Sequence, residues 1–247
     1  MDSNNQQAEI LAESPKPSTV SRIFRVFYEP SSAFKGFTGK FEWIVPLLII
    51  AIVGGILGYQ VQPIFIEDRF EILQERYADN PQVLEYIENS MEEARKHELK
   101  WYFPVLALVV PFIFMAVIAA LGLVIGNFVF GGKAGFWTVM NVVAFAALVG
   151  LLGDIIRNIL MIAKGTSYIY TGLGILKPAD DGSFLFYLFR QIDVFSIWRI
   201  IVTAIGLGVV YNVKPKKFGY VLFGVWAVFI LVVAILNATI FAGGLIY

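Results

Sequence analysis

The chain has 247 residues, of which 58% are hydrophobic and only 15% are charged, and its formal net charge is zero. Soluble domains carry about a quarter charged residues, so this composition and the mean hydropathy of +0.72 indicate an integral membrane protein. The balanced charge gives no indication of a nucleic-acid partner, and the absence of cysteine excludes disulfide and thiol chemistry. With a single histidine, His97, we expect no metal cluster, no cofactor and no His-dependent catalytic site.

The amino-terminal segment divides into a polar tail and a short helical region. Residues 1–17 are polar and include two prolines, which predicts a disordered tail without the apolar core of a signal peptide. From Ser18, apolar residues recur at helical spacing beside Arg22 and Arg25. This pattern predicts an amphipathic helix in the membrane interface, with its cations directed toward anionic headgroups. Pro30 begins a second short helix.

Five segments are apolar enough to cross a bilayer, which takes about twenty residues in a helix. They span about residues 43–62, 102–130, 136–163, 194–211 and 218–240. Residues 18–247 are therefore predicted to form one membrane domain, an all-α integral membrane protein built as a five-transmembrane-helix bundle. Gly54, Gly55 and Gly58 in the first span form a small-residue stripe that permits close helix contact, within the monomer or between two copies.

The longest polar segment, residues 63–100, lies between the first two spans and holds ten acidic and five Lys or Arg residues. Apolar residues alternate with these charges at helical spacing, and Asn80 followed by Pro81 is typical of a helix start. We predict two amphipathic helices that form an acidic, extracytoplasmic hairpin, either a solvated cap or a lobe that docks a partner. A later segment, residues 184–189, is apolar but too short to span, which fits an interfacial or re-entrant helix.

The distribution of basic residues predicts the orientation. Eight of them fall on the amino-terminal side of the membrane, in short segments or near span ends: Arg22, Arg25, Lys35, Lys40, Lys133, Lys214, Lys216 and Lys217. The acidic hairpin falls on the opposite side. The positive-inside rule then places the amino terminus in the cytoplasm and, with five spans, the carboxyl terminus outside it.

Four ionisable residues lie within or at the edges of the third and fourth spans: Asp154, Arg157, Asp193 and Arg199. A charged residue near the centre of a spanning helix costs roughly 2.5–3.5 kcal/mol on insertion scales, and such residues pair with one another or face water. At about 1.5 Å per residue, Asp154 and Arg199 lie at a similar depth. We predict Asp154–Arg199 and Arg157–Asp193 ion pairs, or one shared buried charge cluster. This cluster either fixes the helix register or forms a polar pathway.

Two aspartates near the membrane interior raise the possibility of an aspartyl intramembrane protease, whose motif is similar to Gly-x-Gly-Asp. Here Leu151 occupies the first glycine position, and Asp193 lies at the edge of its span. A cation beside Asp154 would also keep it ionised, which is incompatible with two carboxyl groups that share a proton. A catalytic Ser–His pair is excluded because His97 lies in the polar segment. We therefore expect no enzyme.

Two short motifs carry a resemblance to a known family. Pro30 and Phe34 belong to the segment PSSAF, and Asp193, Phe195 and Trp198 belong to the segment DVFSIW that opens the fourth span. With the five spans and the insertion after the first, the chain resembles the Yip family of Ypt/Rab-interacting membrane proteins. Its short amino-terminal region and acidic hairpin are similar to those of prokaryotic members. The resemblance implies a cytoplasmic amino terminus and no catalytic residue, and eukaryotic members act in vesicle trafficking, membrane shaping and small-GTPase binding.

We therefore expect a non-enzymatic membrane protein of Yip type, located in the prokaryotic cytoplasmic (inner) membrane. It would act as a scaffold or adaptor in membrane organisation or trafficking, or as an accessory subunit of a membrane assembly. The alternative is a small transporter or channel-like subunit whose polar pathway passes Asp154, Arg157 and Arg199. The expected partners are the lipid bilayer and either another membrane protein or a second copy of the chain, with no nucleic acid.

Overall fold

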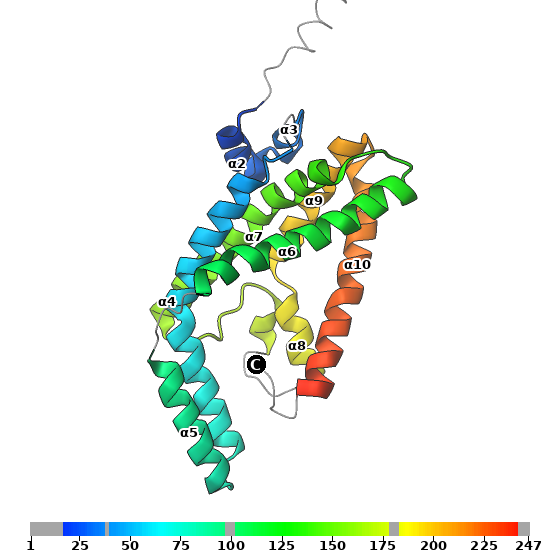
Figure 1. Ribbon diagram of the computed structural model, residues 1–247. Helices are drawn as coiled ribbons and strands as arrows, with labels where there is room; N and C mark the ends of the chain where they lie inside the picture. Colours follow the sequence, from blue (N-terminus) through cyan, green and yellow to red (C-terminus); the bar gives the residue numbers. More distant parts are fainter. Residues whose placement is uncertain (1–16, 38–39, 97–101, 178–182, 242–247) are drawn as a thin grey trace, which may run out of the picture.

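The computed structural model describes residues 17–37, 40–96, 102–177 and 183–241. These residues contain no β-strand, and among them five helices are long and apolar enough to cross a membrane. The five are α4 (Ile44–Arg76), α6 (Phe103–Val124), α7 (Phe136–Lys164), α9 (Val194–Tyr211) and α10 (Pro215–Leu236) (Figure 1). The prediction of an all-α, five-span membrane protein is confirmed. The predicted tail, residues 1–17, lies outside the described residues except for Pro17.

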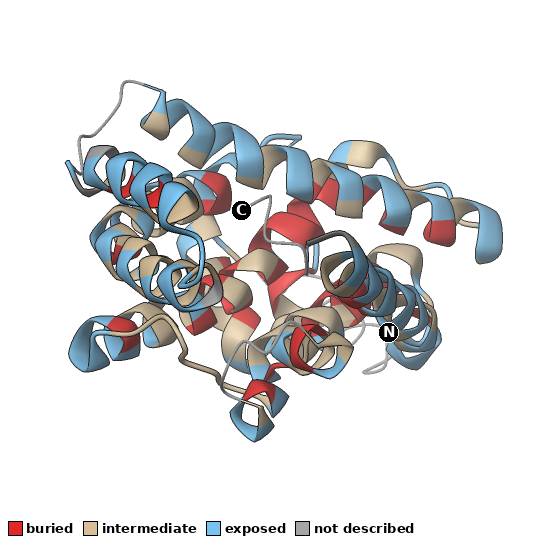
Figure 2. Cartoon of the chain, turned by 90° about the horizontal axis from the view of Figure 1, so that it is seen from below, coloured by how far each residue is buried: buried red, intermediate tan, exposed pale blue. Residues whose placement is uncertain are grey.

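Helix α7 is the centre of the bundle. It packs against α4, α6 and α9, and every residue from 139 to 146 is buried. The one polar side chain in that run, Asn141, accepts a hydrogen bond from the backbone nitrogen of Trp43 at 2.9 Å, so its carbonyl oxygen is satisfied. Figure 2 shows the buried residues gathered inside the molecule, with exposed outer faces around them. Those outer faces carry apolar side chains such as Ile52 and Val228, which suits contact with lipid.

Helix α4 is longer than the predicted first span. It continues past residue 62 and through Pro63 without a break, because the helical spacing of apolar residues continues into the charged segment. The first arm of the predicted hairpin is therefore an extension of the spanning helix. The second arm is α5 (Pro81–Arg95), which packs against α4, buries Ile87 and Met91, and begins where the Asn80 side chain accepts a backbone hydrogen bond at 3.3 Å. The end of the hairpin, residues 97–100, lies outside the described residues.

We call the end of the bundle that carries α5 the distal end, and the opposite end, which carries α2 (Thr19–Tyr28) and α3 (Pro30–Ala33), the proximal end (Figure 1). Helix α2 contacts α7, and α3 contacts α9. The face of α2 that carries Val20, Phe24 and Tyr28 points away from the bundle and is exposed. The amino-terminal helices are thus fastened to the bundle through one face and leave an apolar face free.

The expectation that Arg22 reaches toward lipid headgroups is wrong. Its side chain is only 1% exposed, and it forms an ion pair with Glu42 at 3.3 Å. It also donates to the carbonyl oxygens of Ala33 and Gly36, and its guanidinium carbon lies 4.5 Å from the centre of the Phe37 ring. Burial lowers the pKa of the Arg22 guanidinium from its ordinary value, while Glu42 acts in the opposite direction. A buried arginine is tolerated here because a carboxylate and two carbonyls replace its water.

The segment between α7 and α9 forms a polar loop and a short helix at the distal end. The loop contains the 3-10 turn η2 (Leu173–Leu176), and the helix is α8 (Phe184–Gln191). Ser183 caps α8 by accepting a hydrogen bond from a backbone nitrogen at 3.2 Å. Phe186 and Tyr187 are buried, and α8 packs against α10. A short apolar helix that does not span is therefore present at residues 184–191, as the sequence predicts.

Candidate functional site

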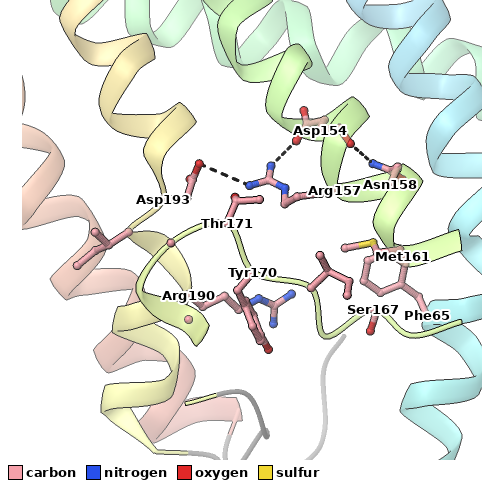
Figure 3. A pocket seen from close by; sticks show the side chains of 14 residues that line it. Phe65, Asp154, Arg157, Asn158, Met161, Ser167, Tyr170, Thr171, Arg190 and Asp193 are labelled. Atoms are coloured by element: carbon pink, nitrogen blue, oxygen red, sulfur yellow. Dashed lines mark hydrogen bonds and ion pairs between the residues drawn. The ribbon is translucent and has the colours of Figure 1, made fainter. Parts of the chain in front are cut away.

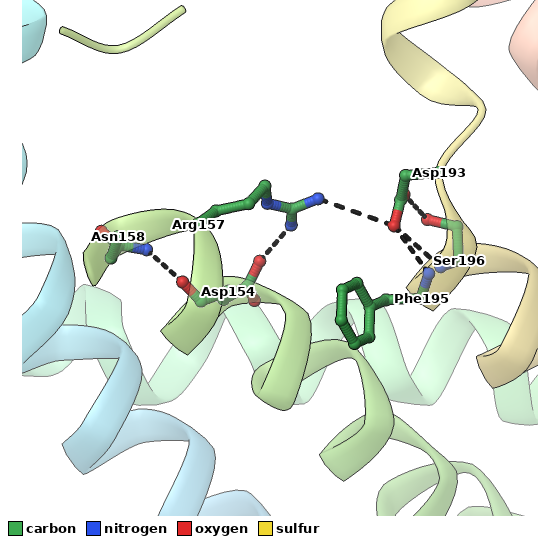
Figure 4. A network of polar contacts seen from close by, with 6 residues as sticks. All are labelled: Asp154, Arg157, Asn158, Asp193, Phe195 and Ser196. Atoms are coloured by element: carbon green, nitrogen blue, oxygen red, sulfur yellow. Dashed lines mark hydrogen bonds and ion pairs between the residues drawn. The ribbon is translucent and has the colours of Figure 1, made fainter. Parts of the chain in front are cut away.

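Polar side chains at the start of α9 and near the distal end of α7 form a connected network (Figure 4). Arg157 donates a hydrogen bond to Asp154, which lies three residues earlier on the same helix. A second guanidinium nitrogen of Arg157 lies 3.7 Å from a carboxylate oxygen of Asp193. Asn158 donates to the backbone carbonyl of Asp154 at 2.7 Å. The predicted contact between Arg157 and Asp193 is therefore present, and it links the two helices.

Asp193 is held in place by backbone groups at the start of α9 and by the loop that follows α7. Its carboxylate caps α9 by accepting hydrogen bonds from the backbone nitrogens of Phe195 at 2.9 Å and Ser196 at 3.1 Å, and from the Ser196 hydroxyl. Gly172 lies in an antiparallel bridge with Asp193. A Cβ atom on Gly172 would lie 2.1 Å from the carbonyl oxygen of Ile192, so glycine is needed for this close approach. One carboxylate thus acts both as a helix cap and as the partner of Arg157.

Arg199 does not form the predicted ion pair with Asp154. Among the described residues no carboxylate is paired with Arg199, and its guanidinium lies against α7 at Gly150, where a Cβ atom would be 3.4 Å from Nη1. The prediction is wrong because depth along a helix says nothing about the direction in which a side chain leaves it. Asp154 instead pairs with Arg157, whose position on the same helix needs no tertiary alignment.

The network lines a cavity of about 320 Å³ at the distal end (Figure 3). Its walls come from α4, α7, the loop after α7, and α8: Phe65, Asp154, Arg157, Asn158, Met161, Ser167, Ile169, Tyr170, Thr171, Gly172, Gly174, Arg190, Ile192 and Asp193. The Asp154 side chain is 51% exposed, whereas that of Asp193 is 10% exposed. The network is therefore shielded from solvent at Asp193, before α9, and accessible to solvent at Asp154, on α7.

Toward the proximal end the interface between α7 and α9 is closed by apolar side chains. On α7, Leu148 and Val149 are buried together with the run from 139 to 146, and on α9 Val202 and Leu207 are buried. On α7 the lining residues begin at Asp154, α4 contributes Phe65, and no lining residue follows Asp193, the residue before α9. The part of the cavity wall that α7 provides therefore starts at Asp154 and continues toward the distal end.

The residues of the two sequence motifs join the amino-terminal helices to α7 and α9. Pro30 is the first residue of α3, and the buried Phe34 ring lies 2.9 Å from where a Cβ on Gly206 of α9 would be. Trp198 meets the Phe27 ring edge-on, with 6.0 Å between ring centres. Phe195, whose ring centre lies 6.5 Å from that of Trp198, packs onto Gly153 of α7, where a Cβ would lie 2.5 Å from the ring. The motif residues therefore serve helix packing, and Asp193 alone reaches the cavity.

Two polar residues at the cavity were not singled out in the sequence. Arg190 stands in the last turn of α8 and lines the cavity. Asp68, on the extended part of α4, accepts hydrogen bonds from the hydroxyl and backbone nitrogen of Ser167 at 2.5 Å each and from the Thr166 hydroxyl at 3.2 Å. No pattern in the sequence indicates that Asp68 contacts Thr166 and Ser167, which lie 98 and 99 positions further along the chain. The only available indication was that Arg190 ends a strongly apolar segment.

These features define a helical integral membrane protein with five candidate spans among its described residues and with amino-terminal helices packed onto the bundle. A profile of the Yip1 domain matches residues 24–236, from α2 to the end of α10. The chain belongs to the Yip1-domain family, in agreement with the resemblance carried by the sequence motifs. Comparisons with curated proteins and with solved structures returned no match.

Proposed function

We propose that the protein is a non-enzymatic scaffold or adaptor in membrane organisation or trafficking, or an accessory subunit of a membrane assembly. The observation that carries this proposal is the packing of α7 against α9 on the proximal side of the cavity, where Leu148, Val149, Val202 and Leu207 are buried. A transport pathway must connect both sides of the membrane, whereas the residues of α7 that line this cavity all lie at or beyond Asp154, toward the distal end. The firm attachment of α2 and α3 through Arg22 further supports a rigid surface at the proximal end.

A second candidate function is that of a small transporter or channel-like subunit. It is favoured by the cavity itself, because polar side chains including Asp154 and Arg157 line an open recess in a membrane protein. In this alternative the buried side chains of α7 and α9 would have to separate during transport. The ion pair of Asp154 with Arg157 disfavours a catalytic role for this aspartate, because its carboxylate is already engaged by a cation on the same helix.

The two functions predict opposite results for a paired experiment. For a scaffold, co-purification from native membranes yields a partner in stoichiometric amount, and an Arg22→Met variant that loosens α2 and α3 loses it. Purified protein in liposomes then conducts no ions, with or without Asp154→Asn. The scaffold proposal fails if the liposomes show a flux that Asp154→Asn abolishes while the variant remains folded, and if no stoichiometric partner is found.

We further propose that the proximal end faces the cytoplasm of a prokaryotic inner membrane and that the distal hairpin is extracytoplasmic. The basic residues at the proximal end support this orientation. Because the chain has no cysteine, single cysteines report topology without background. An Asp79→Cys variant should react with a membrane-impermeant maleimide in intact spheroplasts, and a Lys216→Cys variant only after permeabilisation. The reverse pattern would overturn the orientation.

A further inference from the structure

The fourth spanning helix is short, and α8 lies directly before it. Helix α9 has 18 residues, which is about 27 Å at the helical rise, whereas the hydrocarbon core is about 30 Å thick. The other four candidate spans have 25 to 32 residues. Helix α8 adds 8 residues, and only Ile192 and Asp193 separate it from α9. The two helices together therefore have the length that α9 lacks.

Both helices pack on α10, and they follow one another along it (Figure 1). Near the proximal end, a Cβ atom on Gly219 of α10 would lie 4.0 Å from the Cβ atom of Ala204 on α9. Near the distal end, Ala234 of α10 belongs to one buried cluster with Phe186 and Tyr187 of α8. From Gly219 to Ala234 is 15 residues, and from Ala204 back to Tyr187 is 17. The antiparallel pairing of α9 with α10 thus continues into α8 at almost the same register.

The level of α8 in the membrane follows from its contact with α10. The candidate span that contains α10 is Pro215–Thr239, so its centre is near residue 227, and Ala234 lies about 10 Å beyond that centre at the helical rise. Tilt of α10 only reduces this distance along the membrane normal. Half of the hydrocarbon core is about 15 Å, so the α8 residues that pack on Ala234 lie within the distal leaflet. Close to Ala234 on α10, Val232 and Ile235 are exposed and apolar, as contact with lipid requires.

The interruption between α8 and α9 leaves polar groups at the inner end of α8. The carbonyl oxygen of Ile192 accepts a hydrogen bond from the backbone nitrogen of Leu173 at 2.9 Å, and Asp193 caps α9. Non-helical backbone at membrane depth occurs only where protein buries it or where it borders a water-filled cavity. Ile192 and Asp193 both line the cavity, and so does the exposed side chain of Arg190, in the last turn of α8 (Figure 3). No carboxylate among the described residues is paired with Arg190, so the five donors of its guanidinium group need water at this depth.

We propose that α8 and α9 form one discontinuous crossing, interrupted at Ile192 and Asp193, and that the cavity is a water-filled vestibule within the distal leaflet. Water and small polar solutes enter the vestibule from the distal side and reach Arg190 and the exposed carboxylate of Asp154. The outer side of α8 carries Leu185, which is 49% exposed and contacts acyl chains. The inference concerns one leaflet and holds for a scaffold and for a transporter alike.

The test measures the accessibility of spin labels on the full chain in nanodiscs, with one engineered cysteine at a time, because the chain has no native cysteine. Molecular oxygen concentrates among acyl chains, whereas a nickel chelate stays in water. A label on Leu185→Cys should be relaxed mainly by oxygen, as should a label on Ile52→Cys, which is on the exposed face of α4. A label on Thr171→Cys, which lines the cavity, should be relaxed by the nickel chelate, as should one on Asp79→Cys in the exposed turn before α5.

Ile156→Cys is the matched control, because Ile156 is exposed on α7 beside Arg157 but does not line the cavity. The ratio of nickel to oxygen accessibility at Thr171 should exceed that at Ile156 by roughly tenfold or more, since a polar solute is excluded from hydrocarbon. Ile169→Cys, at a second lining position, repeats the measurement independently of Thr171. A Leu185 label that the nickel chelate relaxes as strongly as the Asp79 label would overturn the discontinuous crossing. Labels at Thr171 and Ile169 that resemble the Ile156 label, or that neither reagent reaches, would overturn the water-filled vestibule.

Discussion

Arg22→Met is the most informative single substitution at the proximal end. Methionine keeps much of the apolar length of arginine but removes the charge and every donor. The variant removes the ion pair between Arg22 and Glu42 and the hydrogen bonds that Arg22 donates to the carbonyl oxygens of Ala33 and Gly36. We therefore expect α2 and α3 to detach from the bundle more often, while the five spanning helices remain folded.

The size of the expected loss in docking free energy follows from the burial of the Arg22–Glu42 ion pair. Removal of one partner of a buried ion pair costs about 3–5 kcal/mol, and each unsatisfied carbonyl costs about 1–3 kcal/mol. These contributions overlap, and the Glu42 side chain is 15% exposed, so water recovers part of the loss. We expect the docking of α2 and α3 to weaken by about 3 kcal/mol. Arg25→Met is the control, since Arg25 is 37% exposed and should cost only about 1 kcal/mol.

The assay uses the absence of native cysteine. A cysteine at position 33, which is 1% exposed as alanine, reacts with a maleimide only when α3 opens. In nanodiscs, Arg22→Met should accelerate labelling by roughly a hundredfold, and Arg25→Met by less than about tenfold. Adding Glu42→Gln to Arg22→Met should restore part of the protection, because the double variant removes both charges of the Arg22–Glu42 ion pair. Equal labelling rates in the Arg22→Met and Arg25→Met variants would refute this account.

Further predictions concern helix packing and the distal loop. Gly153→Ala should lower the stability of the bundle by about 1–3 kcal/mol, because its Cβ would lie 2.5 Å from the Phe195 ring. A Cβ atom at Gly54 would have no atom within 4 Å, so Gly54→Ala should stabilise α4 by up to about 1 kcal/mol. Thermal unfolding in detergent measures the stability of both variants. Melting temperatures that shift in the same direction for Gly153→Ala and Gly54→Ala would contradict the packing argument. Asp68→Ala removes the acceptor of the Ser167 hydrogen bonds, so amide hydrogen exchange should rise in residues 165–172 while the bundle melts at the same temperature. Unchanged exchange there would show that the loop does not depend on Asp68.

The candidate site was only partly accessible from the sequence. Charge and spacing indicated that Asp154, Arg157 and Asp193 belong together, and the structure brings them into contact. The partner of Arg199 was predicted wrongly, because linear depth does not give the rotation of one helix relative to another. Arg190 was missed because its position depends on the path of the loop that returns from α7 to α9.

The sequence by itself determined the number and the order of the spans. Backbone groups without hydrogen bonds are costly in lipid, so a chain that crosses the bilayer forms helices. The position of each apolar segment of about twenty residues then indicates where a helix crosses. Only the tertiary structure decided that Arg22 is buried while Phe24 is exposed, and that the charges at α7 and α9 line a recess. Side-chain direction depends on helix rotation and contact, and those are fixed by packing between segments far apart in the chain, such as Phe195 on Gly153.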